Sequence, residues 1–360
     1  MKYERPHLRG LAGYVPGAQP NAPSVKLNTN ENPYPPSNAV FLKLASLSAD
    51  ILQRYPDPLA QQFRAAAARL HNLSPDHVIA TNGGDELLRL ALATYLDPGA
   101  PLGVLTPSYR LYSVLAAMHD APLAAVPLES DWSLPADTAD RWNASAAPLA
   151  IVTNPHAPSG TLLSVAGLDR LARTFKGVLL IDEAYIDFVD PGLCHRTSEL
   201  VREYPNVLLL RTLSKGYSLA GLRLAYGLGE PDLIAPMLFK TKDSYNVDTI
   251  SQLIGAAALD DARGAASTWE AVRGSRSHLA RALATLGFEC HPSQANFLLA
   301  KAPIGEGLPS AETLYRALMA RGVYVRWFDE DRLRDKLRIS VGTPEENAHL
   351  VRALELELIA

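Results

Sequence analysis

Short apolar runs alternate with segments of helical periodicity along the first two thirds of the chain. The runs HVIAT, LGVLTP, LAIVTN, GVLLIDEAY and NVLLLRT are almost uninterrupted, which is typical of strands buried on both faces. Between them, residues 59–71, 85–96 and 162–175 carry apolar side chains at the spacing of an amphipathic helix. This order predicts an α/β fold whose mainly parallel central sheet is covered by helices.

The pattern changes beyond Glu230. A long helical stretch over about residues 248–286 precedes ANFLLAK, VYVRW and LRISV, which alternate as antiparallel strands do, and a closing helix follows Gly342. The first forty residues are rich in Pro and Asn, which disfavours a regular helix or a central strand there. We therefore expect three parts: an N-terminal arm over residues 1–38, a large domain over residues 39–240 and a small α+β domain over residues 241–360.

Composition narrows the range of partners. The 360 residues carry a formal net charge of -4, which gives no support to a nucleic-acid-binding surface. Cys194 and Cys290 follow no metal-binding spacing and are typical of reduced thiols. The start MKYERPHLRG has the charges but not the apolar core of a signal peptide, and the chain has no apolar run of membrane-spanning length. We expect a cytoplasmic protein that binds neither nucleic acid nor membrane.

Polar side chains follow three of the predicted strands. Each has an ordinary structural explanation, since Asn before Pro starts turns, Asp caps helices and Tyr is often part of a core. Their occurrence at successive strand ends favours a binding site, because ligands of open α/β sheets bind outside the carboxyl ends of strands. These residues are Asn154, Asp182, Tyr185, Thr212, Ser214 and Lys215.

A second group of residues suits a phosphate. In TNGGDELLRLAL two glycines stand between a strand and a helix, where free backbone N–H groups and the helix dipole favour an anion. Arg223, eight residues after Lys215, and the hydroxyl groups of Thr212 and Ser214 add donors for the same anion. The segment therefore predicts a phosphate cradle beside the lysine.

The other residues suit an aromatic ring. The Asp182 carboxylate can hold a proton on a ring nitrogen, and Tyr185 and Asn154 can hydrogen-bond to a ring oxygen. Tyr109 in TPSYRLY can stack on the ring face, and Lys215 can bind an aldehyde. A ligand with a phosphate, a ring nitrogen, a phenolic oxygen and an aldehyde is pyridoxal 5′-phosphate (PLP).

Ten motifs give the chain a family resemblance. In chain order they are YVPG, LNTNENPYPPS, RYPDP, TNGGDELL, TPSY, TNPHAPSG, IDEAYIDF, RTLSKGYSLAGLRLAYG, VYVRWF and LRISVGT. With them the chain resembles the fold type I PLP-dependent aminotransferases, and most closely the histidinol-phosphate aminotransferase family. The resemblance implies that Lys215 carries the cofactor, that Asp182 pairs with its ring nitrogen, and that Tyr185 and Asn154 contact its phenolic oxygen. The implied phosphate ligands are Gly84, Asp85, Thr212, Ser214 and Arg223.

The resemblance also implies substrate-binding residues and an assembly. Arg338 in LRISVGT would receive a substrate carboxylate, and Arg326 and Tyr14 would bind a substrate phosphate near Asn154. Arg326 is equally compatible with a solvated arginine on an edge strand. Tyr55 in RYPDP would reach the cofactor of a neighbouring subunit, which implies a homodimer.

The implied reaction is transamination in histidine biosynthesis, from L-histidinol phosphate and 2-oxoglutarate to imidazole acetol phosphate and L-glutamate. Departures from the family pattern at Pro35, Gly84, Ala157 and Ser159 leave every implied catalytic group in place. Alternatives on the same scaffold are an aromatic amino-acid aminotransferase and a threonine-phosphate decarboxylase. An alternative of another class is a regulatory module that binds PLP without turnover.

Overall fold

A seven-stranded sheet forms the centre of the molecule in the computed structural model, which describes residues 3–20 and 23–359. All of its strands run in one direction except β8, which is antiparallel to both neighbours. The prediction of a mainly parallel sheet is therefore confirmed. In sheet order the strands are β2 (Val78–Thr81), β8 (Ala225–Leu228), β7 (Val207–Thr212), β6 (Val178–Asp182), β5 (Leu149–Thr153), β3 (Leu102–Thr106) and β4 (Leu123–Pro127).

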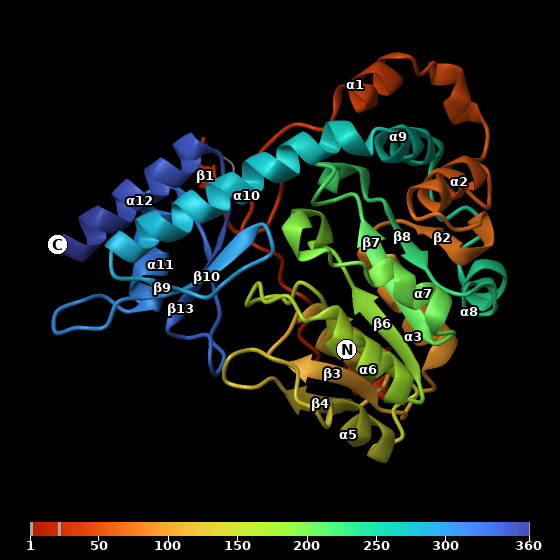
Figure 1. The fold of residues 1–360 in the computed structure, drawn as a ribbon, viewed down its shortest axis with the longest axis horizontal. Coiled ribbons are helices and arrows are strands. Elements are labelled where there is room, and N and C mark those ends of the chain that lie inside the picture. Colours follow the sequence, from red (N-terminus) through yellow and green to blue (C-terminus); the bar gives the residue numbers. More distant parts are fainter. Residues whose placement is uncertain (1–2, 21–22, 360) are drawn as a thin grey trace.

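Helices cover both faces of this sheet (Figure 1). Along β5, Ala150 and Val152 belong to one apolar cluster while Leu149 and Ile151 belong to another, so successive side chains pack on opposite faces. This two-sided burial explains why the strands read as uninterrupted apolar runs. The helices of this part are α1 (Asn38–Ala45), α2 (Gln61–Leu70), α3 (Gly84–Tyr95), α4 (Leu111–Met118), α5 (Thr138–Ala144), α6 (Val165–Thr174), α7 (Leu200–Glu203) and α8 (Pro231–Pro236).

The C-terminal third forms a second sheet with its own apolar core. The helix expected over residues 248–286 is divided at Asp261, whose carboxylate accepts a hydrogen bond from the Gly264 N–H at the start of the second helix. The VYVRW run is likewise divided at Val325. The elements are α9 (Thr249–Asp260), α10 (Ala262–Thr285), β9 (Glu289–Cys290), β10 (Phe297–Lys301), α11 (Ala311–Ala320), β11 (Val323–Tyr324), β12 (Arg326–Trp327), β13 (Lys336–Ser340) and α12 (Pro344–Ile359).

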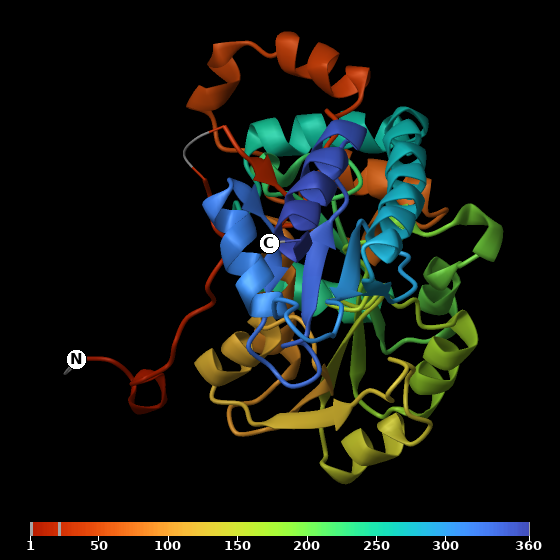
Figure 2. The same ribbon diagram turned by 90° about the vertical axis from the view of Figure 1, so that its left-hand side faces the viewer.

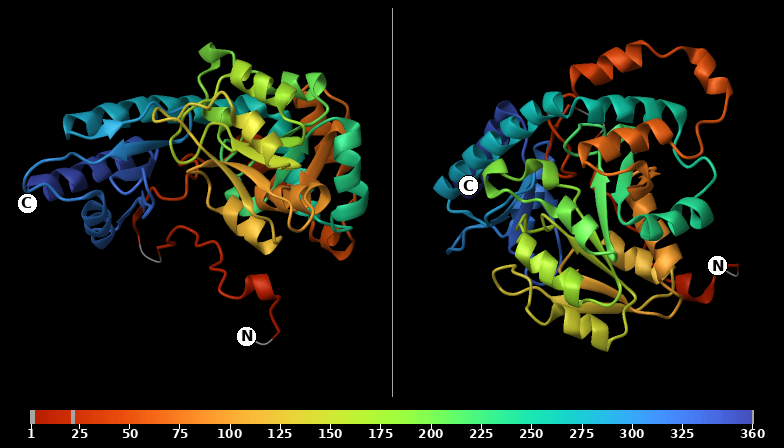
Figure 3. Two further views of the ribbon diagram at one scale, coloured as in Figure 1. Left: turned by 90° about the horizontal axis from the view of Figure 1, so that it is seen from below. Right: turned by 45° about the vertical axis from the view of Figure 1, so that its right-hand side comes forward.

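The N-terminal segment runs along the outside of the molecule and then between its two parts (Figures 2 and 3). Over residues 3–20 and 23–37, its helical content is one short 3-10 turn at Pro6–Leu8, as the Pro-rich sequence predicts. Strand β1 (Val25–Lys26) pairs in parallel with β11, which attaches the segment to the C-terminal third. The division at residues 38 and 240 stays a prediction. Among the described residues, no helix is long and apolar enough to cross a membrane.

Candidate active site

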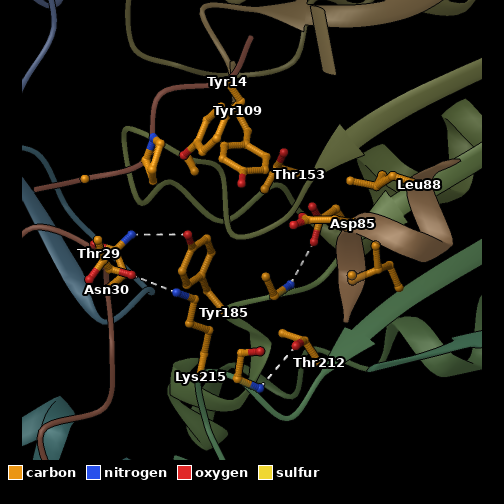
Figure 4. A pocket seen from close by; sticks show the side chains of 18 of the residues that line it. Tyr14, Thr29, Asn30, Asp85, Leu88, Tyr109, Thr153, Tyr185, Thr212 and Lys215 are labelled. Atoms are coloured by element: carbon orange, nitrogen blue, oxygen red, sulfur yellow. Dashed lines mark hydrogen bonds between the residues drawn. The ribbon is translucent and has the colours of Figure 1, made fainter. Parts of the chain in front are cut away.

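One cavity lies where the carboxyl ends of β5, β6 and β7 meet the N-terminal segment and the C-terminal strands (Figure 4). The common direction of these strands brings together residues that are far apart in the sequence. Most of the predicted site residues line this one cavity. They are Tyr14, Gly84, Asp85, Tyr109, Asp182, Tyr185, Thr212, Ser214, Lys215, Arg223, Arg326 and Arg338.

Lys215 follows β7 and points across the cavity toward the N-terminal segment (Figure 4). Its Nζ atom donates a hydrogen bond to the carbonyl oxygen of Thr29 at 2.8 Å. Burial lowers the pKa of the Lys215 amine to about 8, and the positive charges of Arg338 and Arg223 act in the same direction. A substantial fraction of this amine is therefore neutral near physiological pH, as a nucleophile or a base requires.

Asp182 ends β6 and is 5% exposed. The hydroxyl group of Tyr112 donates to its Oδ2 atom at 2.7 Å, and the Ala184 N–H donates to its Oδ1 atom at 3.1 Å. Burial raises the pKa of Asp182 to about 6, although both hydrogen bonds oppose that shift. The carboxylate is thus ionised at neutral pH in a buried place, where a cationic partner would stabilise it. Tyr112 was not among the predicted site residues, although it stands three positions after Tyr109 on α4.

Tyr185 follows β6 and lies across the cavity from Asp85, near Asn30 (Figure 4). Its hydroxyl oxygen accepts a hydrogen bond from Asn30 Nδ2 at 3.1 Å. Burial raises the pKa of Tyr185, while Arg338 and the bond from Asn30 oppose this. The phenol therefore remains protonated and can donate. Asn30 was not among the predicted site residues either. The feature that could have indicated it is the second asparagine of the motif LNTNEN.

The start of α3 forms an anion cradle with the loop after β7. Gly83 has φ +79°, and a Cβ atom there would lie 2.7 Å from Arg223 Nη2, so the close approach of the guanidinium requires glycine. Arg223 Nη1 lies 3.5 Å from Ser214 Oγ, and its Nη2 lies 3.7 Å from Asp85 Oδ2. The Thr212 hydroxyl oxygen accepts from the Ser214 N–H at 3.1 Å. The guanidinium and the helix N-terminus thus face one small space that fits a phosphate.

Two arginines from the C-terminal sheet form another wall. Arg326 on β12 and Arg338 on β13 are directly opposite each other in the antiparallel register. Both guanidinium groups lie over the ring of Phe328, at 5.5 Å and 5.4 Å from its centroid. Arg338 Nη2 donates to the Asn28 carbonyl, but its buried Nε atom has no hydrogen-bond partner among the described residues. Like charges in such a cross-strand pair are destabilising unless an anion lies between them.

Two tyrosines close the cavity on the side of the N-terminal segment (Figure 4). The rings of Tyr14 and Tyr109 meet edge to face with centroids 5.5 Å apart. Burial raises the pKa of Tyr109 strongly, so its phenol stays neutral. The pair provides an apolar wall beside the polar groups, as a planar ligand ring requires.

Asn154 lies directly after β5, as predicted, in the wall behind the cavity. Its side chain is fully buried and does not line the cavity, because both of its polar ends are used nearby. The Oδ1 atom accepts from the Leu163 N–H at 2.8 Å, and Nδ2 lies 2.9 Å from His195 Nε2. Ala157 is the residue of that loop that lines the cavity, and it offers only a methyl group. Asn154 therefore holds the loop, and its contacts to a ring oxygen or a substrate stay a prediction.

Tyr55 also lies outside this cavity. Its side chain is 81% exposed and stacks on Tyr245, with ring centroids 4.6 Å apart. Tyr55 therefore does not contact the cavity of its own chain. Its contact with a neighbouring subunit stays a prediction.

Comparison with known proteins places the chain in a family. The family model "Aminotransferase class I and II" matches residues 22–354. The histidinol-phosphate aminotransferase 1 of Trichormus variabilis is 42% identical over 354 residues, which are 98% of each chain. That of Nostoc sp. is 40% identical over 98% of this chain and 97% of the relative.

Solved structures agree with this relationship. The histidinol-phosphate aminotransferase of Sinorhizobium meliloti in complex with pyridoxal-5′-phosphate matches with a TM-score of 0.89. It is 24% identical and is matched over 98% of this chain and 97% of its own, so this likeness concerns the fold alone. The family model and the two relatives support one conclusion. The chain belongs to the class I and II aminotransferases, and within them to the histidinol-phosphate aminotransferase family.

Proposed function

We propose that this protein is a PLP-dependent aminotransferase that transfers the amino group of L-histidinol phosphate to 2-oxoglutarate. The products are imidazole acetol phosphate and L-glutamate, which places the enzyme in histidine biosynthesis. The observation that carries the proposal is one cavity that combines the Lys215 amine, whose pKa is lowered to about 8, with the opposed arginines Arg326 and Arg338. The first group suits imine chemistry, and the second suits a substrate that brings negative charge.

The cavity fits PLP group by group. The phosphate would lie in the cradle that Gly83 keeps open beside Arg223, because any larger residue at position 83 would displace the guanidinium. Asp182 would hold the ring nitrogen, Tyr185 would donate to the ring oxygen, and Lys215 would bind the aldehyde. When bound, PLP supplies an electron sink for the pair of electrons left when a proton leaves the Cα atom of the substrate.

The protein's own residues move and hold the protons. The Lys215 amine, with its pKa near 8, can accept the Cα proton as a base, because burial and nearby arginines disfavour its charged form. For transamination it would then donate this proton to the carbon of the PLP aldehyde rather than back to Cα. Thr29 supplies the carbonyl that orients the amine. Asp182 keeps a proton on the ring nitrogen, and Tyr112 fixes the direction of that carboxylate.

The arginine pair accounts for both substrates. A phosphate dianion is the ligand that best relieves the repulsion between Arg326 and Arg338, and a guanidinium fork binds phosphate in a bidentate manner. Glutamate brings two carboxylates that the same forks can receive. Tyr14 and Tyr109 offer ring faces and edges for the imidazole of the donor.

We also propose a homodimer in which Tyr55 completes the partner's active site. The helix α1 packs on α9, and the segment that follows it loops outward above α9 (Figure 2). Both expose large apolar side chains. A soluble chain rarely leaves so many uncovered, and such a surface marks a protein interface. The exposed side chains are Phe41, Leu42, Leu44, Leu52 and Tyr55. The domain boundaries and a cytoplasmic location complete this proposal.

Mixing two defective proteins tests the shared site. Lys215→Ala protein and Tyr55→Phe protein would form heterodimers with one site that carries both substitutions and one that carries neither. We expect activity to rise after subunit exchange above the sum of the separate proteins. A fully active monomer would contradict the shared site.

Substrate and cofactor are tested separately. We expect kcat/KM to be higher for histidinol phosphate than for phenylalanine, tyrosine or threonine phosphate. A preference for phenylalanine would indicate an aromatic aminotransferase, and release of carbon dioxide from threonine phosphate would indicate a decarboxylase. Lys215→Ala should abolish the visible absorbance of the covalently bound cofactor, and borohydride should attach the cofactor of the unaltered protein to Lys215. Attachment to another lysine, or cofactor absorbance without turnover of any donor, would refute the assignment.

A further inference from the structure

Two buried side chains, those of Ser340 and Asn30, connect the C-terminal sheet to the hydroxyl group of Tyr185. Ser340 Oγ donates to Asn30 Oδ1 at 2.8 Å, and Asn30 Nδ2 donates to the Tyr185 oxygen at 3.1 Å. Ser340 is 3% exposed and Asn30 is 1% exposed. Figure 4 shows the last of these bonds, with the neighbouring bond from Lys215 to Thr29. We call this chain of hydrogen bonds from Ser340 through Asn30 to Tyr185 the relay. It ends beside Lys215.

The surroundings determine the orientation of the Asn30 amide. The Ser340 oxygen already accepts a hydrogen bond from the Asn30 backbone N–H at 2.9 Å, so its own proton needs an acceptor. Asn30 Oδ1 is that acceptor, which turns the NH2 end of the amide toward Tyr185. Because an NH2 group only donates, the Tyr185 oxygen accepts and its own proton points away from Asn30. That direction leads into the cavity.

The backbone at Asn30 is held as firmly as its side chain. It has φ +56°, a left-handed conformation that asparagine tolerates better than most residues. Its carbonyl oxygen accepts from Asn296 Nδ2 at 2.9 Å, and the Ser340 N–H donates to the Leu27 carbonyl at 2.9 Å. Ser340 stands two residues after Arg338 on the same strand, so the anion-binding wall and the relay share β13.

We propose that Asn30, held by Ser340, is a positioning residue that directs the hydroxyl proton of Tyr185 toward the ring oxygen of the cofactor. This inference rests on the proposed function, in which Tyr185 faces that oxygen. A donor at the ring oxygen competes with the proton of the Lys215–cofactor linkage for the same electron pairs. Loss of the donor therefore raises the pH at which the linkage loses its proton.

Replacing the amide donor by an acceptor tests the direction of the relay. In Asn30→Asp the carboxylate accepts from both Ser340 and Tyr185, so the tyrosine proton turns away from the cavity. Asn30→Gly is the matched control, because glycine tolerates the same backbone conformation and leaves the tyrosine free to turn. The readout is the midpoint of the pH titration of the cofactor's visible absorbance. We expect a rise of about one pH unit for Asn30→Asp and less than half of that for Asn30→Gly.

The charge of the new carboxylate is controlled in a background that lacks the tyrosine hydroxyl. With Tyr185→Phe present, Asn30→Asp should add less than half of the shift that it causes alone. An equal shift in both backgrounds, or no shift at all, would overturn the inference. If Asn30→Asp does not fold, Ser340→Ala is used instead, because loss of the serine proton leaves the Asn30 amide free to turn. An unchanged titration midpoint in Ser340→Ala would also overturn the inference. A missing cofactor band in the unaltered protein would instead refute the proposed function.

Discussion

Replacing Lys215 by methionine should stabilise the cofactor-free protein at neutral pH. The lysine chain is buried, and its charged form is disfavoured by burial and by the positive charges of Arg338 and Arg223. Methionine has a similar unbranched shape and carries no charge. The substitution removes an amine that the reaction requires but whose buried charge destabilises the fold.

The size of the effect follows from the pKa of the amine. The folded value is about 8, against about 10.4 in an unfolded chain. At about pH 7 both states are largely protonated, so the folded state bears the full cost of the buried charge, on the order of 2–3 kcal/mol. As pH rises from about 8 to about 10.4, the folded state loses its proton first and the unaltered protein gains this stability back. The methionine variant has no such gain.

Urea unfolding of both proteins at equal subunit concentration measures this difference. We expect the variant to be more stable by about 2–3 kcal/mol near pH 7 and by less than about 1 kcal/mol near pH 10. Loss of the hydrogen bond to Thr29 and the added apolar contact change the stability difference equally near pH 7 and near pH 10. The dependence of that difference on pH therefore measures only the effect of the lysine charge. A difference that stays constant over this range would refute the account of a neutralised lysine.

Three further substitutions test other parts of the site. Arg326→Gln should lower kcat/KM for histidinol phosphate by about 10- to 150-fold, and for glutamate by less, because a dianion gains more from the guanidinium; equal losses would contradict this. Gly83→Ala should weaken PLP binding about tenfold or more by displacing Arg223, as absorbance titration of the cofactor would reveal; unchanged affinity would place the phosphate elsewhere. Glu183→Gln breaks the ion pair between the fully buried Glu183 and Arg211, which is 15% exposed; the paired atoms lie 2.5 Å apart. The substitution should cost about 3–5 kcal/mol of unfolding free energy; a loss below about 1 kcal/mol by urea unfolding would show that the pair contributes little.

The sequence by itself determined the sheet and the residues that its strand ends carry. Strands buried on both faces must be apolar throughout, so their order was readable without coordinates. Neighbouring parallel strands end at one edge, and this geometric rule brings Asp182 and Lys215 into the same cavity. The glycine loop before α3 was equally readable, and at Gly83 the backbone has a positive φ and a close approach to Arg223 that suit glycine.

Only the tertiary structure decided where loop side chains point and which distant segments meet. Asn154 stands at a strand end as predicted, yet its amide turns to the Leu163 N–H because that buried backbone group needs a partner. Asn30 and Ser340 are 310 positions apart in the sequence, so no local pattern signals their contact. The pairing of Arg326 with Arg338 likewise depends on strand register, which is a property of the folded sheet. Local patterns determine elements and their order, whereas the satisfaction of buried polar groups depends on everything that packs around them.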